Sequence, residues 1–244
     1  MKIHIVNPNT TRAFTQKIAR AARAIAAQGT EIFATQPDFG PVSIEGYYDE
    51  AFAVPGMLAR IREADAQGAQ GHIIACFDDT GLEAARAIAK APVIGIGEAG
   101  FHMATFVATH FSVVTTLALS IIPIEHNIRR YGLERRCGSV RAAGVPVLAL
   151  EERNEAALDL ISREMIAAIA QERAEAIVLG CAGMADLAAE FAQKHGLPVI
   201  DGVSAAVTLM EGCIRMGLKT SRLGAYQPSP AKTYSGIFSG FSLL

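Results

Sequence analysis

The stretch that decides the fold of this chain is Val178-Leu179-Gly180-Cys181-Ala182-Gly183-Met184. It ends a short apolar run, which is typical of a buried parallel strand, and it precedes residues 186–194, where the apolar spacing is helical. Cys181 is therefore expected between the carboxyl end of a strand and the amino end of a helix, where open α/β sheets bind ligands. The helix dipole at such a place stabilises a thiolate or an anion. Taken alone, Cys181 could equally fill a tight turn, since free cysteines are often buried.

The same form occurs a second time, at Ile73-Ile74-Ala75-Cys76-Phe77-Asp78-Asp79-Thr80-Gly81. Again an apolar run leads into a cysteine, a turn and a helical segment, here residues 82–90. Pro92 follows Cys76 by 16 positions, and Pro198 follows Cys181 by 17. Further upstream, each half has an apolar strand that ends in polar residues, at residues 7–11 and at residues 115–116. These matches predict an internal duplication, with two cysteine turns that face each other across a cleft.

The alternation of apolar strands and amphipathic helices predicts an α/β fold. We expect two similar lobes, each a three-layer α/β/α sandwich with a parallel sheet, related by a pseudo-twofold axis and with the active site in the cleft between them. Lobe one is expected to comprise residues 1–97 and 206–244, and lobe two residues 98–205. Helices are predicted at residues 13–27, 48–67, 99–109, 120–131, 154–172 and 204–216. The C-terminal tail from residue 218 is expected to pack on lobe one or on a neighbouring subunit.

Composition and charge argue against several classes of function. The formal net charge of −2 gives no basic surface for nucleic acid. No apolar stretch approaches the roughly 18 residues that span a membrane, and the chain begins with a strand rather than a signal peptide. Four cysteines, without the density of a disulfide framework, predict a reducing, cytoplasmic location. The apolar tail and the Ala-rich helices favour a homo-oligomer. We expect the protein to bind a small-molecule substrate and neither nucleic acid nor a membrane.

The segment Gly95-Ile96-Gly97-Glu98-Ala99-Gly100 matches the G-x-G-x-x-G pattern of dinucleotide-binding proteins. That pattern belongs in the first strand-to-helix turn of such a fold, with an acidic residue about 20 positions further on. Here it follows the fourth predicted strand, and the second lobe begins after it. We therefore predict that these residues shape the crossing between the lobes and bind no nucleotide.

Several other kinds of chemistry fit this sequence poorly. The six histidines are scattered and form no metal-binding motif, no lysine is placed for a pyridoxal Schiff base, and no Cys-x-x-Cys pair exists. We therefore expect neither a cofactor nor a metal. Cys137 and Cys213 have no duplicated partner, so we expect Cys137 to be structural and Cys213 to lie in the core on its helix.

Two facing thiols, Cys76 and Cys181, can invert the configuration of a carbon acid. One thiolate takes a proton from a carbon next to a carbonyl, and the thiol on the opposite face returns one. A helix amino terminus lowers the pKa of a thiol, which favours the thiolate. The long loop at residues 37–46 is expected to cover the cleft and to bring Ile44 to the substrate. Neutral donors for the developing enolate are expected at the backbone of both turns and on Asn9, Thr80, Thr115 and Thr116.

These residues also resemble a known family. Asn7-Pro8-Asn9-Thr10-Thr11, residues 75–82, residues 179–184 and residues 198–203 are similar to motifs of the hydantoin racemase family, which lies within the aspartate/glutamate racemase superfamily. The resemblance covers nearly the whole chain. It implies cofactor-independent racemisation of 5-substituted hydantoins, or of allantoin, by two cysteines in a cleft between two similar α/β lobes.

The resemblance also implies roles for particular residues. Cys76 and Cys181 become the acid–base pair that acts at ring carbon C5. Amino-acid racemases of the superfamily have Asn-Thr after the first cysteine and Thr-His after the second, where this chain has Phe77-Asp78 and Ala182-Gly183. This difference favours a neutral or weakly acidic ring as substrate. The predicted substrate-binding residues are Asn9, Ile44, Phe77, Asp78, Thr80, Thr115, Thr116, Gly180, Ala182 and Gly183.

Other functions stay open as alternatives. Another activity of the superfamily, such as an amino-acid racemase or an isomerase of unsaturated diacids, would use the same cleft. A decarboxylase of malonates would be expected to keep a single catalytic cysteine, so the second cysteine counts against it. A non-catalytic, two-lobed sensor of a small molecule would bind its ligand without either thiol.

Overall fold

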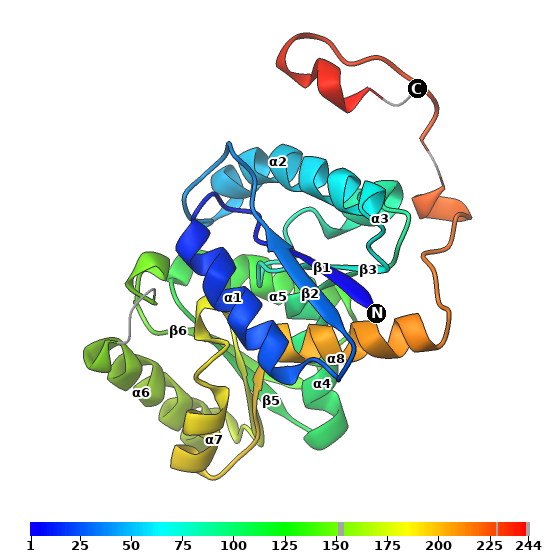
Figure 1. The fold of residues 1–244 in the computed structure, drawn as a ribbon. Coiled ribbons are helices and arrows are strands. Elements are labelled where there is room, and N and C mark those ends of the chain that lie inside the picture. Colours follow the sequence, from blue (N-terminus) through cyan, green and yellow to red (C-terminus); the bar gives the residue numbers. More distant parts are fainter. Residues whose placement is uncertain (151–153, 228, 243–244) are drawn as a thin grey trace.

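The computed structural model describes residues 1–150, 154–227 and 229–242. Its strands form two four-stranded sheets, in which all neighbouring strands run parallel (Figure 1). The first sheet consists of β1 (Lys2–Val6), β2 (Glu31–Thr35), β3 (Gly71–Ile74) and β4 (Val93–Gly95), in the order β2-β1-β3-β4. The second consists of β5 (Phe111–Thr115), β6 (Cys137–Ala142), β7 (Ala176–Leu179) and β8 (Val199–Asp201), in the order β6-β5-β7-β8. The identical strand order confirms the predicted two-lobed α/β fold.

Helices connect the strands and cover both sheets. In the first half they are α1 (Arg12–Ile25), α2 (Tyr47–Ala66), α3 (Leu82–Ile88) and α4 (Ile96–Val107). In the second half they are α5 (Ile121–Arg130), α6 (Glu155–Glu172), α7 (Ala188–His195) and α8 (Gly202–Arg215). Short 3₁₀ helices are η1 (Ala118–Ser120), η2 (Val147–Leu150), η3 (Ala182–Met184), η4 (Gly224–Tyr226) and η5 (Gly236–Phe241). Among the described residues, no helix has the length and apolar character needed to cross a membrane.

The two strands that lead into the cysteines, β3 and β7, are buried along their whole length, which explains the apolar residues that directly precede each cysteine. In the first sheet Val6 pairs with Ile74, and in the second sheet Val114 pairs with Leu179. Parallel strands in register end at the same edge of a sheet. Each pairing therefore brings the polar residues after one strand beside the cysteine turn after its neighbour.

Helices α4 and α8 each follow the last strand of a sheet, and they pack against each other. Figure 1 shows α8 (orange) crossing the centre of the molecule, where it also contacts α1 and β3. The approach is close because α8 begins with Gly202, where an added Cβ would lie 2.3 Å from the backbone oxygen of Ile96. One hydrophobic cluster includes Ile73, Phe101 and Val178, so the two halves share a core. The expected lobe boundaries, after residues 97 and 205, fall inside α4 and α8.

The G-x-G-x-x-G segment forms the end of β4 and the first turns of α4, which begins at Ile96 rather than at residue 99. Its glycines make room for another loop of the same chain. An added Cβ at Gly95 would lie 2.0 Å from Asp79 Oδ1, and one at Gly97 would lie 2.3 Å from the backbone oxygen of Phe77. The glycine spacing therefore reflects close packing of the loop that follows Cys76.

Two other expectations differ from the structure. The helix after Cys181 starts two residues later than predicted, because residues 185–187 form a turn after η3 and α7 begins at Ala188. Cys213 was expected in the core but is only half-buried, in the last turn of α8, where burial decreases toward the exposed Arg215.

The C-terminal segment returns to the first half of the molecule, against α2 and α3. Arg222 donates a hydrogen bond to the backbone oxygen of Ala89, and Tyr226 donates one to Glu83. Further along, Phe238 and neighbouring aromatic residues line an apolar groove beside Leu58 of α2. Figure 1 shows the end of this tail (red) beyond α2.

Candidate active site

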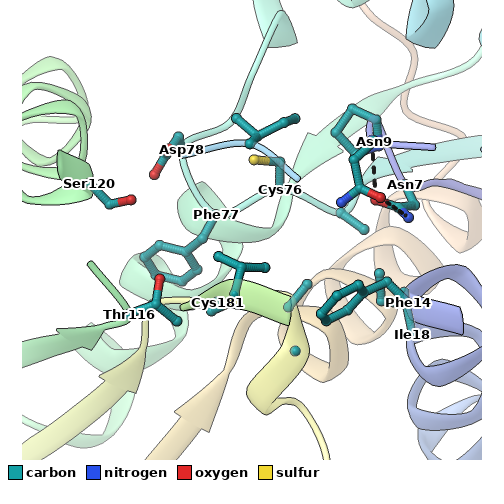
Figure 2. Close-up of a pocket in the computed structure, with 17 residues that line it drawn as sticks. Asn7, Asn9, Phe14, Ile18, Cys76, Phe77, Asp78, Thr116, Ser120 and Cys181 are labelled. Carbon is teal, nitrogen blue, oxygen red and sulfur yellow. Dashed lines mark hydrogen bonds between the residues drawn. The ribbon is translucent and has the colours of Figure 1, made fainter. Parts of the chain in front are cut away.

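Cys76 and Cys181 line the same cleft, whose walls come from both halves of the molecule (Figure 2). Cys76 lies two residues after the end of β3, and Cys181 lies two residues after the end of β7, so the duplication places them equivalently. The empty volume of the cleft, including its mouth, is about 500 Å³. The lining residues are Asn7, Pro8, Asn9, Phe14, Ile18, Ile44, Ala75, Cys76, Phe77, Asp78, Thr116, Ser120, Val147, Gly180, Cys181, Ala182 and Gly183.

Most of the residues predicted to bind the substrate lie in this cleft, namely Asn9, Ile44, Phe77, Asp78, Thr116, Gly180, Ala182 and Gly183. The other two, Thr80 and Thr115, lie behind the cysteine turns. Thr80 Oγ1 donates a hydrogen bond to Cys76 Sγ at 3.3 Å, and Thr115 Oγ1 donates one to the backbone oxygen of Gly180 at 2.9 Å. These two hydroxyls support the thiol-bearing loops from behind rather than lining the cleft.

Seven lining residues were missed by the sequence prediction: Asn7, Pro8, Phe14, Ile18, Ala75, Ser120 and Val147. Some of them carry a signal that could have found them. Asn7 belongs to the polar turn after β1, and Phe14 and Ile18 lie four positions apart on one face of α1. Val147 lies on the short η2, which has no periodicity to read.

Burial raises the pKa of both thiols, contrary to the expectation that a helix end would lower it. For Cys76 the burial raises the pKa well above its ordinary value and the Asp78 carboxyl adds to this, against the hydrogen bond from Thr80. For Cys181 burial raises the pKa to about 11, although a backbone hydrogen bond from Gly183 lowers it. The expectation fails because α3 begins six residues after Cys76 and only a 3₁₀ turn directly follows Cys181.

Hydrogen bonds around Asn9 determine which atom of its side-chain amide is free to contact a ligand in the cleft. Asn9 Oδ1 accepts hydrogen bonds from Asn7 Nδ2 and from the backbone N–H of Thr11, both at 2.9 Å. The oxygen is therefore occupied, and no described residue accepts a hydrogen bond from Asn9 Nδ2. Figure 2 shows this nitrogen on the Cys76 side of Asn9. The amide consequently offers two N–H donors to a ligand oxygen in the cleft.

Asp79 has a structural role in the loop after Cys76. Its carboxylate accepts hydrogen bonds from the backbone N–H groups of Gly97 at 2.9 Å and Glu98 at 2.8 Å, and from Tyr131 Oη at 2.7 Å. It thus caps the first turn of α4 from a neighbouring loop. Burial raises the pKa of Asp79 to about 7, although these hydrogen bonds oppose the shift.

The cleft carries no fixed positive charge of its own, since no lysine or arginine is among its described lining residues. Lys17 lies close enough to Cys181 to lower its pKa, but its ammonium pairs with Asp186 at 3.2 Å and donates to the backbone oxygen of Leu150 at 2.8 Å. Across residues 1–150, 154–227 and 229–242, no group of three or more His, Cys, Asp or Glu side chains is arranged to hold a metal ion. The site therefore offers thiols, amides, hydroxyls and one aspartate.

The two-lobed α/β fold and the sequence together define the class of protein to which the chain belongs. Residues 3–210 match the model of the family described as Asp/Glu/Hydantoin racemase, and the chain belongs to this family. Glutamate racemase from Francisella tularensis shares the fold, with a TM-score of 0.65 at 17% identity over 93% of this chain and 85% of that one.

Two relatives are much more similar. The hydantoin racemase of Rhizobium meliloti is 46% identical over 236 residues, which cover 97% of this chain and 98% of that protein. The structure of allantoin racemase from Klebsiella pneumoniae covers all of both chains with a TM-score of 0.97 and 47% identity. These relatives support racemase activity for this chain.

Proposed function

We propose that this protein is a cofactor-independent racemase of 5-substituted hydantoins or of allantoin, in which Cys76 and Cys181 exchange the proton at ring carbon C5. The observation that carries the proposal is that the two thiols lie at equivalent strand ends and line one cleft. The names of the two relatives described above, hydantoin racemase and allantoin racemase, support the substrate class. A planar enolate held between the two thiols would receive a proton on either face.

The reaction needs one thiolate and one thiol. The thiolate takes the C5 proton and becomes a thiol, while the electron pair of the broken C5–H bond moves into the enolate. The opposite thiol then delivers its proton to the other face of C5 and becomes a thiolate. The two cysteines end with their protonation states exchanged, so the same pair catalyses the reverse reaction. The raised pKa of Cys76 and Cys181 makes either thiolate a strong base toward a carbon acid.

The polar groups of the cleft suit a neutral ring. The free amide of Asn9 is a donor for the carbonyl oxygen that gains negative charge in the enolate, and it brings no fixed charge. An amino acid or a diacid carries carboxylates, which proteins bind with cations or many N–H donors. The described lining contains no cation that would pair with a carboxylate. These features favour the hydantoin ring over the other substrates of the superfamily.

Four single variants test the proposal: Cys76→Ser, Cys181→Ser, and the matched controls Cys137→Ser and Cys213→Ser. We expect the first two to lose racemisation by on the order of 10³-fold, because each removes one acid–base group. The controls should stay within about twofold of wild type, because both cysteines lie outside the cleft lining. The measurement is the loss of optical rotation of one enantiomer of a 5-substituted hydantoin, and of allantoin, with an enzyme-free run subtracted.

The same series separates the alternatives. Wild-type activity in Cys76→Ser or Cys181→Ser would contradict the two-thiol mechanism. Ligand binding that is unchanged in both variants, without racemisation by wild type, would favour a non-catalytic sensor.

A further inference from the structure

Asp78 carries the one carboxyl group among the described lining residues of the cleft, and this group combines three features. It lines the cleft, it is only 9% exposed, and no hydrogen bond among the described residues reaches its carboxyl group. Its backbone is held in place, since Asn127 Nδ2 donates to its carbonyl oxygen at 2.7 Å. Figure 2 shows the carboxyl directed toward the same space as the hydroxyl of Ser120. Buried carboxyl groups almost always have partners, so this one is placed to meet a partner that arrives with the substrate.

The surroundings of Asp78 keep its proton on. The titratable groups that act on it or feel its charge are Glu50 on α2, Asp79 beside it, Cys76 after β3 and Cys181 after β7. None of these groups is a cation. Burial raises the pKa of Asp78 to about 8, and the carboxylates of Glu50 and Asp79 add to the shift. Near neutral pH, Asp78 therefore offers one O–H donor and one acceptor oxygen side by side.

We propose that Asp78 recognises the ring of the substrate as a neutral carboxylic acid: its O–H donates to a ring carbonyl oxygen while its other oxygen accepts the adjacent ring N–H. This assignment rests on the proposed function. A five-membered ring forces its amides to be cis, which places C=O and N–H on the same edge. An open-chain secondary amide is trans, so its C=O and N–H point in opposite directions and cannot meet one carboxyl group together.

The pairing defines a substrate class, the cyclic ureides and lactams, at the expense of their ring-opened forms. In a ring-opened carbamoyl amino acid the N–H next to the chiral carbon is trans to its carbonyl, so only the terminal NH2 group could pair with Asp78 together with that carbonyl. Its free carboxylate would enter a cleft whose described lining holds no cation. The pairing also explains why a carboxyl group can sit beside Cys76 without stopping the chemistry: in its protonated form it adds no negative charge near the enolate.

The test compares wild type with Asp78→Asn and Asp78→Leu, and with Asp159→Asn as a control on an exposed part of α6. An asparagine amide keeps one donor and one acceptor, whereas leucine keeps neither. At pH 7 we expect Asp78→Asn to retain kcat/KM within about fivefold, and Asp78→Leu to lose on the order of 100-fold, chiefly through KM. The inhibition constant of unsubstituted hydantoin, which has no configuration to invert, should rise by a similar factor in Asp78→Leu only.

The pH profile distinguishes a binding acid from a purely structural residue. The ratio of kcat/KM for Asp78→Asn to that for wild type should rise above a pH of about 8, where the Asp78 carboxyl loses its proton and its donor. The rise should reach up to about tenfold per pH unit. The substrate and the two cysteines also ionise in this pH range. Dividing the kcat/KM of Asp78→Asn by that of wild type removes the pH effects that are the same in both enzymes. Circular dichroism reports whether each variant is folded. If Asp78→Leu does not fold, the pH dependence of kcat/KM for Asp78→Asn relative to wild type decides the question.

Three results would overturn the assignment. The first is a loss in Asp78→Asn as large as that in Asp78→Leu at all pH values, which would indicate an ionised acceptor or a structural role. The second is a folded Asp78→Leu that binds hydantoin as wild type does. The third is a flat asparagine ratio between pH 7 and 9.5. If wild type itself neither racemises nor binds any hydantoin, the proposed function fails and the assignment falls with it.

Discussion

At the scale of single residues, neighbours in the chain have different tasks because the backbone turns them in different directions. Asp78 presents its carboxyl group to the cleft, whereas Asp79 caps α4. Asp79 has a φ of 51°, in the left-handed region that Asp tolerates better than most residues. In the second half, Thr116 lines the cleft while Thr115 supports Gly180 from behind. The chemistry of the site therefore depends on loop geometry around each thiol as much as on the thiols.

Thr80 offers a prediction at this scale, because its hydroxyl donates a hydrogen bond to Cys76 Sγ. The variant Thr80→Val keeps the shape of the side chain and removes the donor. Since the hydrogen bond stabilises the thiolate, its loss raises the pKa of Cys76 further, and we expect kcat/KM at pH 8 to fall by about tenfold. The pH dependence of alkylation of the Cys76 peptide, followed by mass spectrometry, measures the shift.

The matched control is Thr208→Val on α8, where an exposed hydroxyl donates to the backbone oxygen of Ser204. It should leave both the alkylation profile and the activity unchanged. An unchanged Cys76 profile in Thr80→Val would show that the hydroxyl does not tune the thiol.

At the scale of elements, a buried chain of hydrogen bonds ties together the two strands that carry the first half of the site. His4 on β1 is paired in register with His72 on β3, and their Nδ1 atoms lie 3.1 Å apart. His72 Nε2 lies 3.0 Å from Asp65 Oδ1, and His4 Nε2 lies 2.8 Å from Thr35 Oγ1. One assignment satisfies every atom: His72 donates to Asp65, His4 Nδ1–H donates to His72, and Thr35 donates to His4.

This chain makes stability depend on pH. Burial, with a smaller contribution from His72, lowers the pKa of His4 to about 3. The unfolded chain takes up a proton at a pKa of about 6.5, so the folded state binds fewer protons between these values. The contribution of His4 is therefore full above pH 6.5 and is lost as the pH falls, by up to about 1.4 kcal/mol per pH unit.

The variant His4→Gln removes this titration. The quantity to compare is the free energy of unfolding of wild type minus that of His4→Gln. We expect this difference to decrease by about 2 kcal/mol when the pH is lowered from 7 to 5. Urea unfolding at each pH measures the difference, and subtracting the variant cancels the titration of Asp78 and Asp79. A difference that stays constant over this range would contradict the assigned burial of a neutral His4.

The elements also show what the sequence could and could not predict. Buried parallel strands are apolar on both faces, so the apolar runs before Cys76 and Cys181 could be recognised as β3 and β7 from the sequence. The adjacent pair Thr115 and Thr116 could be assigned to the end of β5. Successive residues of an extended chain point to opposite sides, however, and no pattern tells which one faces the cleft. Val147 was beyond prediction because a four-residue 3₁₀ helix has no periodicity.

At the scale of the whole molecule, duplication explains how two thiols come to line one cleft. Each half has the same strand order and places its cysteine after the equivalent strand. The packing of α4 on α8 joins the halves through a shared core. The sequence repeat predicted that Cys76 and Cys181 lie at equivalent positions and face one cleft. The burial that raises their pKa follows from this packing, which no local pattern encodes, and that is why the expected lowering was wrong.

Deuterium exchange at C5 is the most direct test of the claim that each thiol serves one face of the substrate. Each pure enantiomer of a 5-substituted hydantoin is incubated in deuterated water with Cys76→Ser or Cys181→Ser. Proton NMR follows the C5–H signal while optical rotation follows inversion. We predict that each variant exchanges the C5 proton of a single enantiomer without inverting it, and that the two variants select opposite enantiomers. Exchange of the same enantiomer by both variants, or racemisation by wild type without deuterium uptake, would contradict a mechanism with one thiol on each face.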